Sequence, residues 1–156
     1  MWEDGEESGA KWRIVGTLKG EHAYALDEKG RVVIPPKFRP ILGDQVVAIR
    51  GFETCVGVYS PTEWLKVEEA VRRLPVKQQT VLRYVLASAV DLEVDRQGRI
   101  MLPTHLRDHA KIRREVVVVG LSSRVEIWSR SLWKTYLEKV KKSVPKLAET
   151  IEELRI

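Results

Sequence analysis

The chain has 156 residues, 44% of them hydrophobic, which is enough for one ordinary domain or for two small modules that share a core. Its formal charge of +5, from 27 Lys and Arg against 22 Asp and Glu, is compatible with a polyanionic partner such as nucleic acid. The single cysteine excludes an internal disulfide, and the acidic start and the absence of an apolar run near ~18 residues exclude a secretion signal and a membrane span. We therefore expect a soluble, cytoplasmic protein.

The first third of the chain predicts strands around one short helix. We expect residues 1–16 to be a flexible N-terminal extension, because its beginning is polar and acidic. Alternation in HAYAL and in RVVI predicts two strands joined by a turn at DEKG. The stretch PPKFRPILG predicts a short helix that ends at Gly43, and QVVAIRGFETCVGVYS predicts two strands around a turn at Gly51.

Two longer helices are predicted next. Ser60 is a good N-cap, Pro61 a good first helical residue, and Glu63 completes a capping box. The helix that begins there is predicted to run to about Leu74, where Pro75 interrupts it. Apolar residues at helical spacing then predict a second helix over about 76–89.

The same order of elements then restarts. DLEV and RIML flank DRQG, PTHLRDHA predicts a short helix, REVVVVG and RVEIWS predict paired strands, and RSLWKTYLEKVKK predicts a long helix. The chain closes with apolar residues at coiled-coil spacing, broken by Pro145. This stripe is an oligomer contact, a contact for a partner helix or a face packed on its own domain, and we favour the last about equally with the first. Its residues are Leu137, Val140, Val144, Leu147, Ile151 and Leu154.

The restart is an internal repeat. At an offset of 68, DEKGRVVIPPKFR beginning at Asp27 matches DRQGRIMLPTHLR beginning at Asp95, and after one inserted residue the match continues at an offset of 69. Each copy's β-rich half is too short to bury a stable core alone, so we expect the copies to share one. The predicted fold is α+β, with a first module over 17–89, a second over 90–156, and helices packed outside a composite β core.

The repeated phrase predicts a hairpin turn with an additional property. Asp27 and Asp95 suit the opening of a type I turn, and Gly30 and Gly98 suit its left-handed closing position. A turn does not require the arginine that follows each glycine, Arg31 or Arg99. Beside an aspartate that holds its guanidinium, such an arginine is suited to phosphate or to a guanine edge.

The two segments YALDEKGRVVIPPKFRPILGD and DLEVDRQGRIMLPTHLRDHAKIRREVVVVGLSSRVEIWS resemble the two halves of the MraZ family, bacterial regulators built from tandem AbrB-like modules. The resemblance covers about Gly20 to Trp133. It implies a pseudo-two-fold, swapped-hairpin β-barrel, sequence-specific binding of double-stranded DNA, and ring-like homo-oligomers. It also implies regulation of the promoter of the division and cell-wall gene cluster, including the protein's own gene, and thus a nucleoid-associated protein.

The resemblance places the family's DNA-contacting arginines on Arg31 and Arg99, and its motif aspartates on Asp27 and Asp95. Lys29 and Arg96 are added as DNA contacts because they are cations within the same loops. Gln97 stands in the second loop where the first has Lys29, so we expect the two modules to contribute unequally.

The remaining histidines and tryptophans favour structural roles over metal binding or base stacking. His105 and His109 have a spacing that can bind metal, but no third ligand is evident and we expect no metal and no cofactor. The residues Trp64, Trp128 and Trp133 favour core packing over base stacking. No nucleophile–base arrangement or phosphate loop is present, so we expect neither an enzyme nor a small-molecule substrate. The main alternative is a protein-interaction module, antitoxin-like or inhibitory, with little DNA contact.

Overall fold

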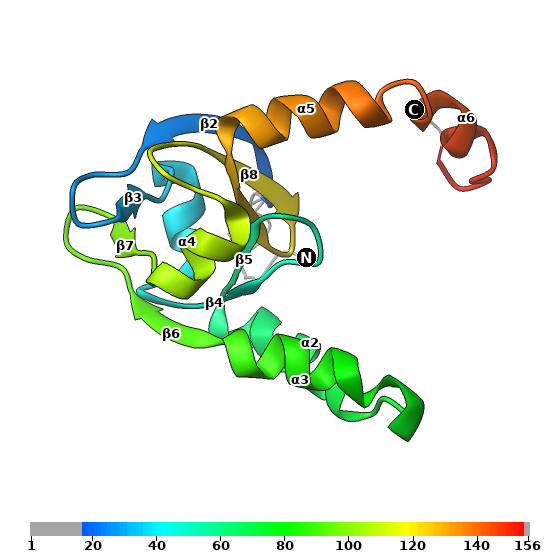
Figure 1. Cartoon of the computed structure of the whole chain (residues 1–156), viewed down its shortest axis with the longest axis horizontal. Helices are drawn as coiled ribbons and strands as arrows, with labels where there is room; N and C mark the ends of the chain where they lie inside the picture. Colours follow the sequence, from blue (N-terminus) through cyan, green and yellow to red (C-terminus); the bar gives the residue numbers. More distant parts are fainter. Residues whose placement is uncertain (1–16, 155–156) are drawn as a thin grey trace, which may run out of the picture.

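The computed structural model describes residues 17–154, whose strands form an open six-stranded antiparallel sheet and a separate two-stranded ribbon (Figure 1). The sheet has the order β2-β8-β9-β5-β4-β6. The ribbon pairs β3 (Arg31–Val33) with β7 (Arg99–Met101). The sheet strands are β2 (Leu18–Ala25), β4 (Gln45–Arg50), β5 (Val56–Tyr59), β6 (Val90–Glu93), β8 (Glu115–Ser122) and β9 (Val125–Ser129).

The two copies exchange their edge strands. β2 of the first copy pairs with β8 of the second, and β6 of the second copy pairs with β4 of the first. Strands β5 and β9 join the copies at the centre of the sheet. Reversing the strand order and interchanging the copies reproduces the same order, so the sheet has pseudo-two-fold symmetry. One buried apolar cluster accordingly contains residues from both copies.

The expectation of a closed β-barrel requires correction. Within residues 17–154 the sheet has two edges, β2 and β6, and the β3–β7 ribbon is a separate sheet. Both ribbon strands have only three residues. Pro35 and Pro103 follow shortly after them, and a proline has no backbone N–H with which to extend a ladder.

The predicted helices are present, with altered ends. α2 (Pro61–Arg72) begins as expected, since the Ser60 hydroxyl accepts a hydrogen bond from the Glu63 backbone N–H at 3.2 Å, but it ends two residues before Leu74. The first short helix is a 3-10 turn, η2 (Pro36–Phe38), that continues as α1 (Arg39–Leu42) and ends at Gly43. The others are η3 (Val76–Gln78), α3 (Gln79–Ser88), α4 (Thr104–Ala110), α5 (Arg130–Val140) and α6 (Val144–Glu149).

Three apolar clusters hold these elements together. The largest lies between the sheet, the ribbon and the short helices α1 and α4. A second places α2 and α3 on β4 through Val47, Ile49, Trp64 and Val85, and a third places α5 on β8 and β9 around Trp128. Trp64 and Trp128 are buried and Trp133 is partly buried, which confirms the prediction that these tryptophans pack in the core.

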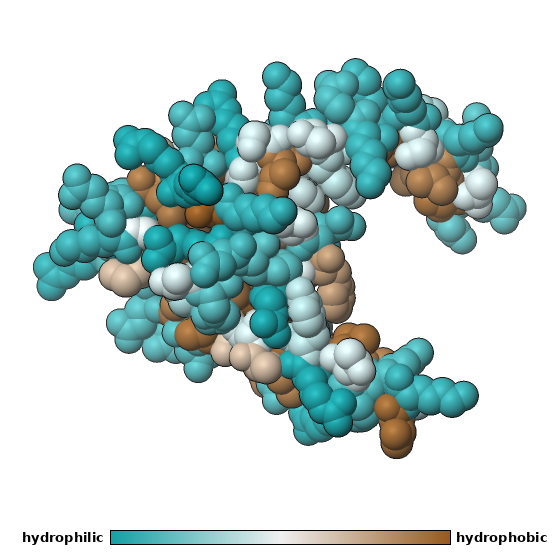
Figure 2. All heavy atoms as spheres, viewed as in Figure 1, coloured by the Kyte–Doolittle hydropathy of each residue, from teal (hydrophilic) through white to brown (hydrophobic). Residues whose placement is uncertain are grey.

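Two helical arms, α2–α3 and α5–α6, project from the same side of the β body (Figure 1). The prediction that the C-terminal apolar stripe packs on its own domain is wrong for α6, which has no buried residue and leaves Leu147 60% exposed. Figure 2 shows apolar surface near the ends of both arms. Among residues 17–154, no helix is long and apolar enough to cross a membrane.

Candidate nucleic-acid interface

The first repeated phrase forms a turn that is fixed almost entirely by Asp27. Its backbone carbonyl accepts a hydrogen bond from the Gly30 N–H at 3.0 Å, and Gly30 has the positive φ of 80° that the turn requires. Carboxylate Oδ1 accepts from the backbone N–H groups of Lys29 and Arg31, both at 2.9 Å. The other oxygen, Oδ2, accepts from Nε of Arg31 at 2.6 Å. One side chain therefore shapes the turn and orients the arginine.

The second phrase repeats this arrangement bond for bond. Asp95 Oδ1 accepts from the backbone N–H groups of Gln97 and Arg99, and Oδ2 accepts from Nε of Arg99, all at 2.9 Å. Gly98 has a φ of 78° and donates to the Asp95 carbonyl at 2.9 Å. The geometry of a held guanidinium, which the sequence suggests, is thus present in both copies.

The β3–β7 ribbon brings the two loops together. In its register Arg31 lies opposite Met101, and Val33 lies opposite Arg99. Nη1 of Arg99 lies 3.8 Å from Oδ2 of Asp27, so the two Asp–Arg pairs are in contact. The side chains of Arg31 and Arg99 are 27% and 25% exposed. Both loops therefore occupy one end of the molecule, away from the helical arms (Figure 1).

The electrostatics of the loops keep both carboxylates ionised. The backbone hydrogen bond from Arg31 is the largest cause that lowers the pKa of Asp27, from 3.8 to about 2, and the Arg31 side chain adds to it. The corresponding backbone bond from Arg99 lowers the pKa of Asp95. Each ionised carboxylate binds one edge of its guanidinium, so the remaining N–H groups are oriented for a ligand such as phosphate or guanine.

The other predicted contacts lie in the same loops. Lys29 and Arg96 are both exposed. Arg96 also borders a hollow of about 530 Å³ beside the second loop, together with Arg39 and Asp95. The sequence interpretation did not include Arg39 or its repeat partner Arg107 in the site, although their matching positions in the repeat were a signal.

The histidines have a structural explanation. His105 Nε2 lies 3.0 Å from the carbonyl of Ser88, and His109 Nε2 lies 3.1 Å from the carbonyls of Gly51 and Glu53. They attach α4 of the second copy to the end of α3 and to the loop at residues 51–53 of the first copy. Within residues 17–154, no group of three His, Cys, Asp or Glu side chains could hold a metal ion.

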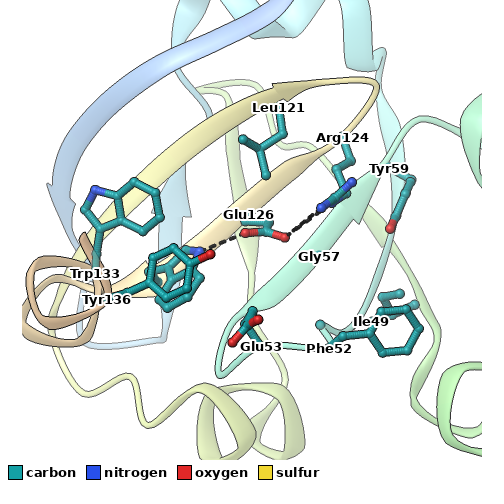
Figure 3. Close-up of a pocket in the computed structure, with 12 residues that line it drawn as sticks. Ile49, Phe52, Glu53, Gly57, Tyr59, Leu121, Arg124, Glu126, Trp133 and Tyr136 are labelled. Atoms are coloured by element: carbon teal, nitrogen blue, oxygen red, sulfur yellow. Dashed lines mark hydrogen bonds and ion pairs between the residues drawn. The ribbon is translucent and has the colours of Figure 1, made fainter. Parts of the chain in front are cut away.

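A separate cavity of about 380 Å³ is lined by residues of strands β4, β5, β8 and β9, of the loop at 51–53 and of α5 (Figure 3). Its aromatic wall includes Trp133 and Tyr136, whose rings are stacked with their centroids 5.8 Å apart. Glu126 has both oxygens engaged, since one accepts from Arg124 Nη2 at 3.1 Å and the other from Trp128 Nε1 at 2.9 Å. Burial raises the pKa of the nearby Cys55 thiol and so favours its protonated form.

The duplicated hairpin loops, each with an arginine held by its own carboxylate, define a tandem-repeat protein of mixed α and β structure. The family model described as "MraZ protein, putative antitoxin-like" matches residues 17–82 and again residues 85–153. The chain therefore belongs to the MraZ family, and this confirms the resemblance noted in the sequence.

Curated relatives support this assignment over most of the chain. A protein named "Transcriptional regulator MraZ" from Caldanaerobacter subterraneus subsp. tengcongensis is 43% identical over 142 residues, which cover 89% of this chain and 99% of the relative. The protein of the same name from Natranaerobius thermophilus is 44% identical over 140 residues, covering 88% and 98%. MraZ is a family of transcriptional regulators and not of enzymes, as expected from the sequence.

Proposed function

We propose that this transcriptional regulator binds double-stranded promoter DNA sequence-specifically through loops 27–31 and 95–99. Arg31 and Arg99 contact bases, while Lys29 and Arg96 contact phosphates. The observation that carries the proposal is the pair of guanidinium groups, each held by its own aspartate and brought together by the β3–β7 ribbon. Holding a guanidinium before binding lowers the entropy cost of a bidentate contact with guanine.

The proposed target is a set of short direct repeats in the promoter of the bacterial division and cell-wall gene cluster, including the protein's own gene. Membership of a family whose relatives are named transcriptional regulators supports a regulatory function. The target itself is what the family resemblance implies. Binding there would make the protein cytoplasmic and nucleoid-associated.

We also propose the finer architecture that the family resemblance implies. The modules at 17–89 and 90–156 correspond to AbrB-like units, and the exchange of β2 and β6 between the copies is their swapped-hairpin arrangement. The two separate family matches, over 17–82 and 85–153, support this division of the chain.

We further propose that the protein associates with itself to form a ring of identical subunits. One bidentate arginine contact discriminates between bases by only about 1–3 kcal/mol. When one subunit is bound, the other subunits of the ring are held at a high effective concentration near the neighbouring repeats. Their contacts would therefore increase the overall affinity and the discrimination between DNA sequences. Exposed apolar side chains on the arms support self-association, with Val76 87% exposed on one arm and Leu147 60% exposed on the other.

A gel shift with the gene's own upstream region tests the DNA-binding site. Arg31→Ala and Arg99→Ala should each weaken specific binding by roughly tenfold or more, a change of about 1.4 kcal/mol or larger, without loss of fold by circular dichroism. Arg72→Ala, an exposed arginine on α2, is the matched control and should bind as the wild type does. Normal binding by both loop variants would refute the site.

The alternative function is a protein-interaction module with little DNA contact. The salt dependence of the binding affinity distinguishes the two functions. Binding through several cations should weaken steeply between about 50 and 200 mM salt. Association with a protein partner through apolar surface should change far less. A shallow salt dependence together with insensitivity to Arg31→Ala would favour the protein-interaction module.

A further inference from the structure

We call the loops 27–31 and 95–99 the recognition loops. The glycine that closes each of them is covered by an arginine from the opposite copy. Gly30 and Gly98 are buried, although the loops around them are exposed. A Cβ atom added to Gly30 would lie 3.1–3.3 Å from the guanidinium of Arg107. A Cβ atom added to Gly98 would overlap the guanidinium of Arg39. Only glycine allows these guanidinium groups to lie so close to the loop backbone.

Both covering arginines are anchored in the same way. Nε of Arg39 donates to the carbonyl of Ile34 at 3.1 Å, and Nε of Arg107 donates to the carbonyl of Leu102 at 3.0 Å. The backbone N–H of Ile34 in turn donates to the Gly98 carbonyl at 2.8 Å. The N–H of Leu102 donates to the Gly30 carbonyl at 3.0 Å. One residue of each copy therefore binds both its own arginine and the glycine of the opposite loop.

The two arginines differ in their second hydrogen bond. Nη2 of Arg107 donates to the hydroxyl of Thr104, a residue of the same helix α4, at 3.3 Å. Nη2 of Arg39 crosses to the second loop and donates to the Gln97 carbonyl at 3.3 Å. The repeat places Pro36 where the second copy has Thr104, and proline has no hydroxyl to accept this bond. The substitution therefore explains why Arg39 reaches the other copy.

We propose that Arg39 and Arg107 are positioning residues that each set the recognition loop of the opposite copy, and that Arg39 holds loop 95–99 by a direct hydrogen bond. The proposal rests on the proposed function, because it concerns how the DNA-contacting loops are held. Each of the two arginines thereby connects its own copy to the loop of the other copy. The direct bond from Arg39 also makes the second loop the more firmly held of the two.

Hydrogen exchange measured by mass spectrometry tests the crossed arrangement without DNA. Arg39→Gln should accelerate amide exchange in loop 95–99 and leave loop 27–31 near its wild-type rate. Arg107→Gln should show the reverse pattern, and the buried strand β8 provides an internal standard in both variants. Acceleration of the loop in the variant's own copy, or equal acceleration of both loops, would overturn the proposal.

A DNA measurement separates positioning from a direct charge contact. Arg39→Lys keeps the charge but loses the planar fork that bonds Ile34 and Gln97. For a positioning residue, both Arg39→Lys and Arg39→Gln should reduce discrimination between the upstream fragment and a scrambled fragment by roughly tenfold. The lysine variant should keep the wild-type slope of log affinity against log salt. Full discrimination by Arg39→Lys would show that only the charge matters and would overturn the proposal.

The variant Pro36→Thr tests the asymmetry while leaving both arginines in place. The new hydroxyl should capture Nη2 of Arg39 as Thr104 captures Arg107, so exchange in loop 95–99 should rise toward that of loop 27–31. Unchanged exchange would remove the role assigned to the Gln97 bond. Since none of the exchange results requires DNA, failure of wild-type protein to bind the upstream fragment would refute the proposed function separately.

Discussion

The carboxylate of Asp27 combines two tasks because its two oxygens have different partners. Oδ1 binds backbone N–H groups and so fixes the turn, whereas Oδ2 binds the Arg31 guanidinium. A turn alone explains the aspartate and the glycine of the repeated phrase, but not the arginine. The bond from Oδ2 shows that the arginine is part of the same local structure, and it recurs in the second copy at Asp95.

The lowered pKa of Asp27 predicts a pH-dependent contribution to stability. The carboxyl titrates at about 2 in the folded protein and near its ordinary value of 3.8 when unfolded, so its contribution is fully present above pH 3.8. It is lost as the pH falls through about 2. In urea denaturation, Asp27→Asn should be less stable than the wild type at pH 7, and the difference should shrink between pH 4 and 2. A constant difference across that range would contradict the assignment.

Gly30 and Gly98 separate the effect of backbone strain from that of crowding, because both have a positive φ, 80° and 78°, which an alanine adopts only at a cost. A Cβ built on Gly30 would lie 3.1–3.3 Å from the Arg107 guanidinium, whereas a Cβ built on Gly98 would overlap the Arg39 guanidinium. Gly98→Ala should therefore cost more stability than Gly30→Ala in thermal or urea denaturation, because its methyl group must displace the Arg39 guanidinium. Equal costs for the two variants would show that the guanidinium groups move freely.

The sequence predicts the arrangement of the two loops better than it predicts the residues that support them. The turn chemistry and the family resemblance together indicate Asp27, Arg31 and their repeats. Arg39 and Arg107 match at the same offset, but their contacts cross between the copies. Such contacts depend on which strands pair, and the local pattern of residues does not contain that information.

At the scale of elements, helix starts were predictable because they depend on adjacent residues. Ser60, Pro61 and Glu63 indicate the start of α2 correctly. Its end was predicted two residues late, since the effect of Pro75 extends to the residues before it. The pairing of β2 with β8 joins residues about a hundred positions apart, and alternation within a strand does not specify such a partner.

Loss of the α2 cap should affect stability without affecting DNA binding. Ser60→Ala removes the hydroxyl that accepts from the Glu63 N–H and should cost about 1 kcal/mol in the free energy of unfolding. The exposed neighbour Thr62 provides a control, for which Thr62→Ala should change stability by less than about 0.5 kcal/mol. A loss of DNA affinity in Ser60→Ala at a temperature where it is fully folded would contradict the separation of arm and site.

At the scale of the whole molecule, each copy lacks strands that the other supplies. The β2–β8 and β4–β6 pairings both cross between copies. Fragments 1–89 and 90–156, produced separately, should therefore show no cooperative unfolding transition. Mixed in equal amounts, they should associate and recover the circular dichroism spectrum of the intact chain. Independent folding of either fragment would show that the shared core is dispensable.

The exposed stripe on the C-terminal arm gives a second prediction at this scale. Replacing Leu147 and Ile151, which are 60% and 46% exposed, by serine should reduce the oligomer size measured by light scattering while preserving the fold. The control Glu149→Gln changes a polar residue on the same arm and should leave the size unchanged. Unaltered assembly in the double variant would exclude this part of the arm from the interface.

In the proposed mode of binding, the unequal loops would give the molecule a direction along its DNA target. Two identical loops related by a two-fold axis would read a palindrome equally well in either orientation. Here Gln97 occupies the repeat position of Lys29. Pro36 and Thr104 likewise occupy one repeat position, and the arginines that follow them, Arg39 and Arg107, have different second hydrogen-bond partners. Each subunit would therefore distinguish the two ends of its binding element, and inverting one element within a promoter should cost more affinity than moving it by a whole helical turn.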